Sequence, residues 1–179
     1  MASILSVNKS LEHNFSKTPV DKILLIEGEG VEGDSHRGVT VKHRSRVKAD
    51  PTQPNLRQVH LMHNELIDEL NEKGFRVKPS SMGENITTID IDLLSLPRNT
   101  ILKIGATAKI QITGLRNPCA QLNHFQDGLM SAVLDKDDQG NLIRKAGVMS
   151  IVLCGGVIKP KDKIEIILPT QPHEKLDRV

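Results

Sequence analysis

The sequence predicts a mainly β fold with a few helices, of the α+β class, built as a β-barrel or a β-sandwich. The strongest evidence is the alternation of apolar and polar residues over 107–113 (TAKIQIT) and 162–168 (DKIEIIL), which is the period of a half-buried strand. Four further short β-rich runs cover residues 3–7, 22–27, 100–105 and 147–153. Glycine and proline occupy most of the gaps between the runs. Many short strands with few helices argue against a parallel α/β sheet.

Only two segments have the pattern of a helix. Asn64 is expected to cap a helix that runs to Lys73, and Gly74 is expected to end it. The apolar residues of this segment recur at a spacing that places them on one face. The second segment follows Cys119, and Asp127 is expected to cap its later part.

The length of 179 residues suits a single domain that buries about 70% of its unfolded surface. We expect a core from about residue 3 to residue 169 and a loosely held tail over 170–179. The polar, proline-bearing segment 46–57 is predicted to be a mobile loop. The two cysteines, Cys119 and Cys154, could form one disulfide at most, which favours a reducing cytoplasm over a secreted scaffold.

The composition excludes several classes of partner. The formal charge is 24 − 22 = +2, too small to imply a nucleic acid or an anionic membrane. Aromatic residues make up 2% of the chain, so the stacking platforms of single-strand nucleic-acid binding are missing. The longest apolar run, residues 150–158, is too short to span a bilayer, and the N-terminal residues lack the pattern of a secretory signal. We therefore expect no nucleic-acid partner, no membrane association and a cytoplasmic location.

The context of Cys119 predicts a reactive thiol. Pro118 suits the start of a helix, so Cys119 is expected in the first turn, where backbone N–H groups carry partial positive charge. Arg116 adds a full charge, and both features stabilise a thiolate, which is a nucleophile and a soft-metal ligand. The alternative for Cys119 is a small buried hydrophobe, the commonest state of a free cysteine. Cys154 lies in an apolar run with no cation near it in sequence, so we expect it to be structural.

Two other polar stretches are weaker candidates for chemistry. Residues 28–38 carry four glycines around Asp34 and His36, for which a flexible turn is the simpler interpretation. His60 and His63 have a spacing that suggests metal, but no third ligand accompanies them, so ordinary histidines are favoured.

Two further stretches could bind a heterocycle or an anion. Residues 83–88 (GENITT) offer a carboxylate, an amide and two hydroxyls for directed hydrogen bonds. Arg144 and Lys145 just precede an apolar strand, and their simpler interpretation is a solvated hairpin end. Their functional interpretation is an anion clamp, with Arg144 as the principal phosphate ligand and Lys145 as a weaker contributor.

Taken in order, these stretches resemble one family, the MOSC domain, named for the C-terminal domain of molybdenum-cofactor sulfurases. The resemblance covers nearly the whole chain, and its most specific part is the series GEN-T-GLR-PC-QL followed by RKAGVM. It implies a β-barrel fold similar to the β-barrel domain of pyruvate kinase, with a few helices packed on it. It also implies binding of the molybdenum cofactor (molybdopterin), a pterin that carries a dithiolene and a phosphate.

The resemblance also assigns roles to residues. In the family, the cysteine matched here by Cys119 ligates molybdenum or carries sulfur as a persulfide, which makes Cys119 the candidate catalytic residue and metal ligand. No pyridoxal-phosphate site is expected within the chain, because the desulfurase domain of the larger relatives is missing. The residues expected to hold the cofactor are Arg57, Asn85, Thr87, Arg116, Arg144 and Lys145.

Several functions remain open at this point. The protein could be a molybdenum-dependent oxidoreductase that reduces N-hydroxylated bases or related N–O compounds with electrons from a donor protein. It could instead be a carrier that takes sulfur or cofactor from a sulfurase or another supplying protein. Outside the family, the alternatives are a metal-free β-barrel binding module and Cys–His acyl chemistry through Cys119 with His60 or His124.

Overall fold

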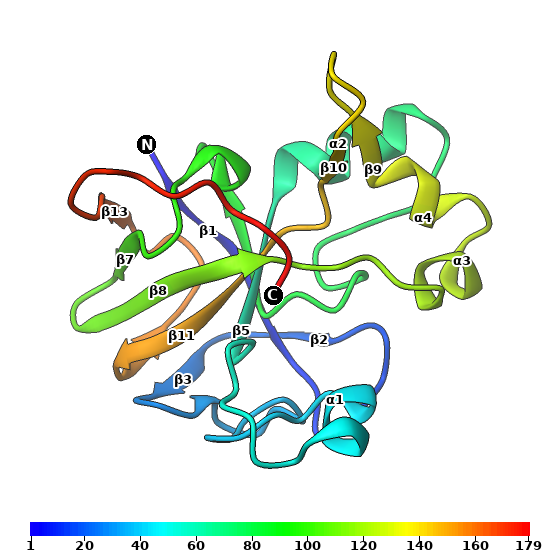
Figure 1. Cartoon of the computed structure of the whole chain (residues 1–179). Helices are drawn as coiled ribbons and strands as arrows, with labels where there is room; N and C mark the ends of the chain where they lie inside the picture. Colours follow the sequence, from blue (N-terminus) through cyan, green and yellow to red (C-terminus); the bar gives the residue numbers. More distant parts are fainter.

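A curled mixed sheet organises the computed structural model, which describes residues 1–179 (Figure 1). Its strands follow the order β13 (Ile164–Ile167), β7 (Ile101–Ile104), β8 (Ala108–Leu115), β11 (Val148–Cys154), β5 (Val59–His63), β6 (Ile86–Ile89), β1 (Ser3–Lys9) and β2 (Thr18–Val20). All neighbours pair antiparallel except β5 and β6, which are parallel. The α+β class predicted from the sequence is confirmed.

The remaining elements are small. A three-stranded sheet contains β12 (Gly156–Ile158), β3 (Ile23–Ile26) and β4 (Gly30–Val31), and a hairpin joins β9 (Leu134–Lys136) to β10 (Leu142–Arg144). The helices are α1 (Arg44–Ala49), α2 (Asn64–Glu72), the 3-10 turn η1 (Leu93–Ser95), α3 (Gln121–Phe125) and α4 (Leu129–Ala132). None of them is long and apolar enough to cross a membrane.

The sheet curls until β1, the first strand of the chain, meets the segment that leads into β13, the last strand. A bridge joins Ser3 to Lys163, and the amide of Ile164 donates to the carbonyl of Ala2 at 2.9 Å. The inner face of the sheet holds an aliphatic core, to which β8 contributes the alternate residues Ala108, Ile110 and Ile112. The alternation read in the sequence therefore places the apolar side chains of β8 in the core.

A second apolar cluster lies under the helices. The parallel pair β5 and β6 needs a crossover connection, and α2 provides it. Leu66, Ile67 and Leu70 are buried on one face of α2, as predicted. Asn64 is the first helical residue and not the cap, which is His63, while Gly74 adopts a left-handed backbone with φ of 95° at the predicted stop.

Two segments are more ordered than the sequence predicts. Residues 46–57 were expected to be a mobile loop, but α1 extends through Ala49 and the side-chain amide of Asn55 donates to two backbone carbonyls at 2.9 Å.

The tail 170–179 is held along the end of β8, where the amide of Leu115 donates to the carbonyl of Asp177 and the carbonyl of Leu115 accepts from the amide of Val179. Gly114 makes this possible, because a Cβ there would lie 2.5 Å from the carbonyl oxygen of Asp177. Local composition could not predict either contact, since the partners are far away in sequence.

Candidate functional site

A cavity of about 520 Å³ opens where several loops converge, a size typical of small-ligand sites. Its walls come from residues 14–17, from the stretch between His36 and His60, and from residues 82–85, 116–121, Met149 and Val179. These segments are distant in sequence, and the curled sheet brings them together at one end.

The lining of the cavity is cationic. None of the lining residues is an aspartate or a glutamate. The lysines and arginines among them are Lys17, Lys42, Arg46, Arg57 and Arg116. Such a concentration of one charge in a concave site attracts anions, although the chain as a whole is nearly neutral.

Cys119 lines this cavity, and it is the only cysteine that does so. The prediction that it lies in the first turn of a helix is wrong, because α3 begins at Gln121 and has five residues. Cys119 instead ends the loop that follows β8, and its carbonyl accepts from the amide of Leu122. Its thiol is half-buried and points to Oε1 of Gln121 at 3.7 Å.

The cation beside Cys119 is where the sequence placed it. Arg116 donates through Nη1 to the carbonyl of Met82, and its guanidinium lies 5.8 Å from the centre of the Phe15 ring. Burial lowers the pKa of Arg116, whereas the negative charges of Cys119 and Glu84 act to raise it. Arg116 therefore provides the positive charge that the thiol of Cys119 faces.

Arg57 is the second predicted residue on the cavity wall. Its Nη2 donates to the main-chain oxygen of Val179, and its Nε is buried with no hydrogen-bond partner. Burial lowers the pKa of Arg57 to about 10, and the nearby Arg46 and Arg116 add to that effect. A buried donor without a partner is costly, so an acceptor that reached Nε would stabilise the site.

Asn85 lines the cavity, but both ends of its side chain are used by the fold. Its Nδ2 donates to the carbonyl of Asn8 at 3.2 Å, and its Oδ1 accepts from the amide of His60 at 3.1 Å. Thr87 is fully buried away from the cavity, where its hydroxyl donates to Oε1 of Glu84 at 2.9 Å. Both side chains are therefore used by the fold, that of Asn85 in the wall of the cavity and that of Thr87 outside it.

The structure does not bring the predicted clamp to the cavity. Lys145 forms an ion pair with Glu69 on α2, and its side chain is only 15% exposed. Arg144 ends β10 and donates from Nε to Oδ1 of Asn117 at 3.2 Å. Asn117 lines the cavity, whereas Arg144 does not. Of the predicted cofactor ligands, Arg57, Asn85 and Arg116 share the cavity with Cys119, and Thr87, Arg144 and Lys145 do not.

Some lining residues carried no recognisable signal in the sequence. Lys17 precedes β2, Lys42 precedes α1 and Arg46 lies in α1, and only the folded chain brings Lys17 to the other two. His36 lies in the stretch 28–38, which is one of the stretches that resemble the MOSC family, so the sequence did point to this residue. His60 is buried with Nε2 at 2.8 Å from the carbonyl of Ala146, and burial holds its pKa well below the usual range. Nowhere do three or more His, Cys, Asp or Glu side chains gather as a metal site.

Most of the cavity lining falls within a region that matches a known protein family. The MOSC domain model matches residues 43–165, more than half of the chain. The chain belongs to the MOSC domain family. The match includes Arg57, Asn85, Arg116 and Cys119, the predicted residues that line the cavity.

Solved structures agree with the MOSC fold. The YuaD protein from Bacillus subtilis has a TM-score of 0.75 and 23% identity, over 95% of this chain and 98% of that one. YiiM from Geobacillus stearothermophilus has a TM-score of 0.68 and 18% identity, over 98% of this chain and 80% of that one. YiiM from Escherichia coli has a TM-score of 0.64 and 20% identity, over 97% of this chain and 73% of that one. The search of curated proteins finds no match.

MOSC domains are associated with the molybdenum cofactor, and the cavity residues fit that group. A thiol is a soft ligand that suits molybdenum bound to sulfur, and arginine suits a phosphate. The unpartnered Nε of Arg57 supplies a donor that an oxyanion would satisfy. The lining contains no aspartate or glutamate, so no acidic side chain there repels an anionic ligand.

The position of Cys119 leads to a prediction about the two thiols. Both cysteines are half-buried, but only Cys119 lies in a cationic cavity next to Arg116. At neutral pH we expect iodoacetamide to alkylate Cys119 about tenfold or more faster than Cys154, because a neighbouring cation favours the thiolate. Mass spectrometry of peptides from a time course measures both rates in one sample. Equal rates would remove the argument that Arg116 activates Cys119.

Proposed function

We propose that this MOSC domain binds the molybdenum cofactor in the cavity, with Cys119 next to the metal and the arginines next to the phosphate. The observation that carries this proposal is the placement of one thiol in a cavity lined by lysine and arginine and by no aspartate or glutamate. The cofactor is anionic and sulfur-rich, so both halves of this lining are complementary to it.

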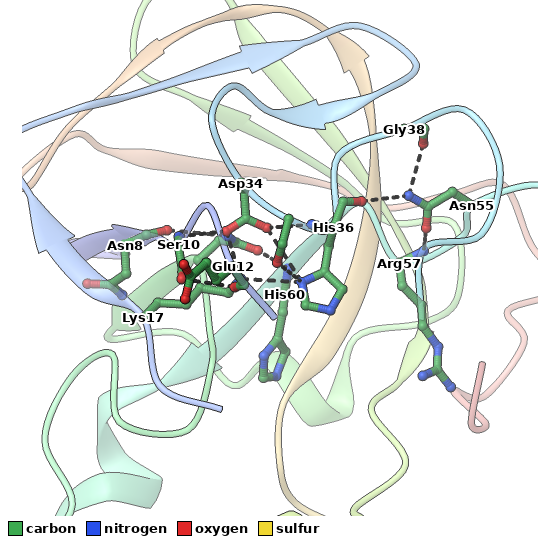
Figure 2. A network of polar contacts seen from close by, with 12 residues as sticks. Asn8, Ser10, Glu12, Lys17, Asp34, His36, Gly38, Asn55, Arg57 and His60 are labelled. Atoms are coloured by element: carbon green, nitrogen blue, oxygen red, sulfur yellow. Dashed lines mark hydrogen bonds and ion pairs between the residues drawn. The ribbon is translucent and has the colours of Figure 1, made fainter. Parts of the chain in front are cut away.

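The lining residues have separate parts in this proposal. Cys119 offers one protein ligand for the metal, and Arg116 stabilises the charge of that thiolate. Arg57 presents its free Nε to an oxyanion of the cofactor. Asn55 fixes Arg57, because its Oδ1 accepts from the Arg57 amide at 3.0 Å while its Nδ2 holds the carbonyls of His36 and Gly38 (Figure 2).

We infer further that the bound cofactor is used for reduction of N-hydroxylated bases or related N–O compounds. When bound, the cofactor supplies two-electron redox chemistry, with electrons from an external donor protein. Reduction of an N-hydroxy compound takes up two electrons and two protons and releases an amine and water. The observation that favours this use over a sulfur carrier is the presence of titratable side chains, His36 and Lys17, on the same cavity wall.

The test is to purify the chain from a bacterial strain that makes molybdenum cofactor and from an otherwise identical strain that cannot. We expect molybdenum and pterin in equal amounts from the first strain, and neither from the second. Elemental analysis and the fluorescence of the oxidised pterin measure them independently. Protein without molybdenum, from cells that load a known cofactor enzyme in parallel, would contradict the proposal.

Turnover is then tested with a viologen as the electron donor and an N-hydroxylated base as the substrate. Release of the amine by loaded protein, and none by protein from the second strain, is the result expected of a reductase. Loaded protein that gives no amine, but passes cofactor or sulfur to an acceptor protein, would support a carrier instead.

A further inference from the structure

A buried ion pair lies at one wall of the cavity, with Lys17 in the lining and Asp34 outside it. The ammonium of Lys17 is 2.7 Å from Oδ1 of Asp34, and the two side chains are 3% and 0% exposed. Oδ1 also accepts from the amide of Ser10 at 3.0 Å, and Oδ2 accepts from the amide of His36 at 3.1 Å. The carboxylate is therefore fixed on both oxygens, and these donors hold the pKa of Asp34 well below its usual range despite its burial.

His36 connects this pair to the cavity. Its ring is about one third exposed, at 32%, and it belongs to the cavity lining, whereas Asp34 does not. The Nδ1 atom lies 3.4 Å from the Lys17 ammonium, 3.3 Å from the Ser35 hydroxyl and 3.6 Å from Oδ2 of Asp34. Figure 2 shows the Nδ1 edge of the ring turned to Lys17 and Asp34 and the Nε2 edge turned away from them. No protein group forms a hydrogen bond with Nε2.

The neighbours of Nδ1 favour one tautomer of His36. An ammonium can only donate, and the Lys17 ammonium lies closer to Nδ1 (3.4 Å) than Oδ2 of Asp34 does (3.6 Å). We infer that Nδ1 accepts from Lys17 when the ring is neutral, which places the ring proton on Nε2. When the ring is protonated, Nδ1–H gains the carboxylate of Asp34 as its partner. His36 can therefore alternate between the two charge states while the same edge of the ring faces the pair.

We propose that His36 is a proton-transfer group of the cavity, and that Lys17 and Asp34 hold its Nε2 proton toward the ligand. This deepens the proposed function and rests on it for the substrate class, which is a compound with an N–O bond. In the step that breaks the N–O bond of an N-hydroxy compound, the external donor supplies two electrons and Nε2 gives its proton to the departing hydroxyl, which leaves as water. Nδ1 takes a proton from the Lys17 ammonium in the same step, so the ring stays neutral. The nitrogen of the product takes the second proton from solvent, and solvent then reprotonates Nε2 while Nδ1 returns its proton to Lys17.

Other titratable groups lie near His36. The His13 ring meets the His36 ring edge to face with centroids 5.3 Å apart. Burial lowers the pKa of His13 and of His43, and the charge of His36 adds to that effect. The charged or titratable groups near the ring are therefore Lys17, Asp34, His13 and His43.

The first test needs no cofactor. In the purified protein with histidine nitrogens labelled with ¹⁵N, two-bond ¹H–¹⁵N spectra identify the tautomer of each neutral imidazole. We expect neutral His36 to carry its proton on Nε2, with the His36→Gln variant used to assign the signal. A proton on Nδ1 would overturn the proposal, because Nε2 would then have no proton to give.

The second test uses loaded protein. His36→Gln should retain the molybdenum and pterin of the wild type but reduce an N-hydroxylated base about 10²- to 10⁴-fold more slowly. Its rate should also vary less between about pH 5 and 8, where histidine titrates. His13→Gln is the matched control, since this ring stacks on His36 but does not line the cavity, and it should keep the wild-type rate.

The outcomes separate the two proposals. A His36→Gln protein with unchanged rate and pH profile would overturn the role of His36 and leave cofactor binding intact. Wild-type protein that never holds cofactor would contradict the proposed function, and the tautomer measurement would still decide whether His36 presents a proton to the cavity.

Discussion

Replacing Cys119 by alanine is expected to abolish the retention of molybdenum. The cavity contains one thiol, so the variant removes the only thiolate that the protein offers to the metal. The cationic lining stays in place and can still attract the phosphate, so pterin retention should fall less steeply than molybdenum retention. Elemental analysis and pterin fluorescence on the same purified samples measure the two losses separately.

Cys154→Ala is the matched control for this experiment. Cys154 ends β11, outside the cavity, and its thiol contacts the adjacent carbonyl of Gly155 at 3.8 Å. This variant should keep the molybdenum content of the wild type. Cys119→Ser, which keeps the shape and replaces sulfur by oxygen, should behave like Cys119→Ala. Full molybdenum content in Cys119→Ala would show that the metal is held by other residues.

Asp34→Ala is expected to destabilise the protein by about 3–5 kcal/mol, because it leaves the ammonium of Lys17 buried without a partner. The variant also removes the acceptor for the amides of Ser10 and His36. Urea unfolding followed by circular dichroism measures the free energy of unfolding. The double variant Lys17→Met/Asp34→Leu removes both charges and should recover much of that loss. A double variant no more stable than Asp34→Ala would contradict the pairing argument.

The same pair gives a pH dependence with a defined sign. Asp34 has a folded-state pKa below its unfolded value, so its contribution to stability is fully present above the unfolded pKa of about 4. The contribution is lost as the pH falls from there toward the folded value. The wild type should therefore lose stability relative to Lys17→Met/Asp34→Leu below about pH 4, and the difference should stay constant between pH 6 and 8. Unfolding curves of both proteins over this range provide the check.

Periodic patterns predicted the parts of the fold that local sequence determines. The alternation in β8 and the apolar face of α2 follow from the repeat of each element, so Ile110, Ile112 and Leu66 are buried as expected. The held tail could not be predicted in this way. It depends on the missing side chain of Gly114, which is 63 residues from Asp177 in sequence.

The candidate site was predictable only where residue chemistry is distinctive. Cys119 and Arg116 are neighbours in sequence, and the structure keeps them together on one wall. Asn85 and Thr87 showed the limit of this reasoning, because a polar side chain can serve the fold as well as a ligand. The start and the short length of α3 could not be predicted from the local sequence either. Pro118 is compatible with a helix start, but the chain makes a turn at Cys119 before the helix begins at Gln121.

The hydrogen bonds of Asn85 have a consequence for the assembly of the cavity. Asn8 and Asn85 exchange main-chain and side-chain bonds across 77 residues, and Asn85 also fixes the amide of His60. Closing a loop of this length costs conformational entropy, which the bonds between the two asparagines help to offset. The cavity wall is complete only when the first strand has joined the sheet. On the proposed function, the cofactor therefore meets the full set of lining residues only in the folded chain.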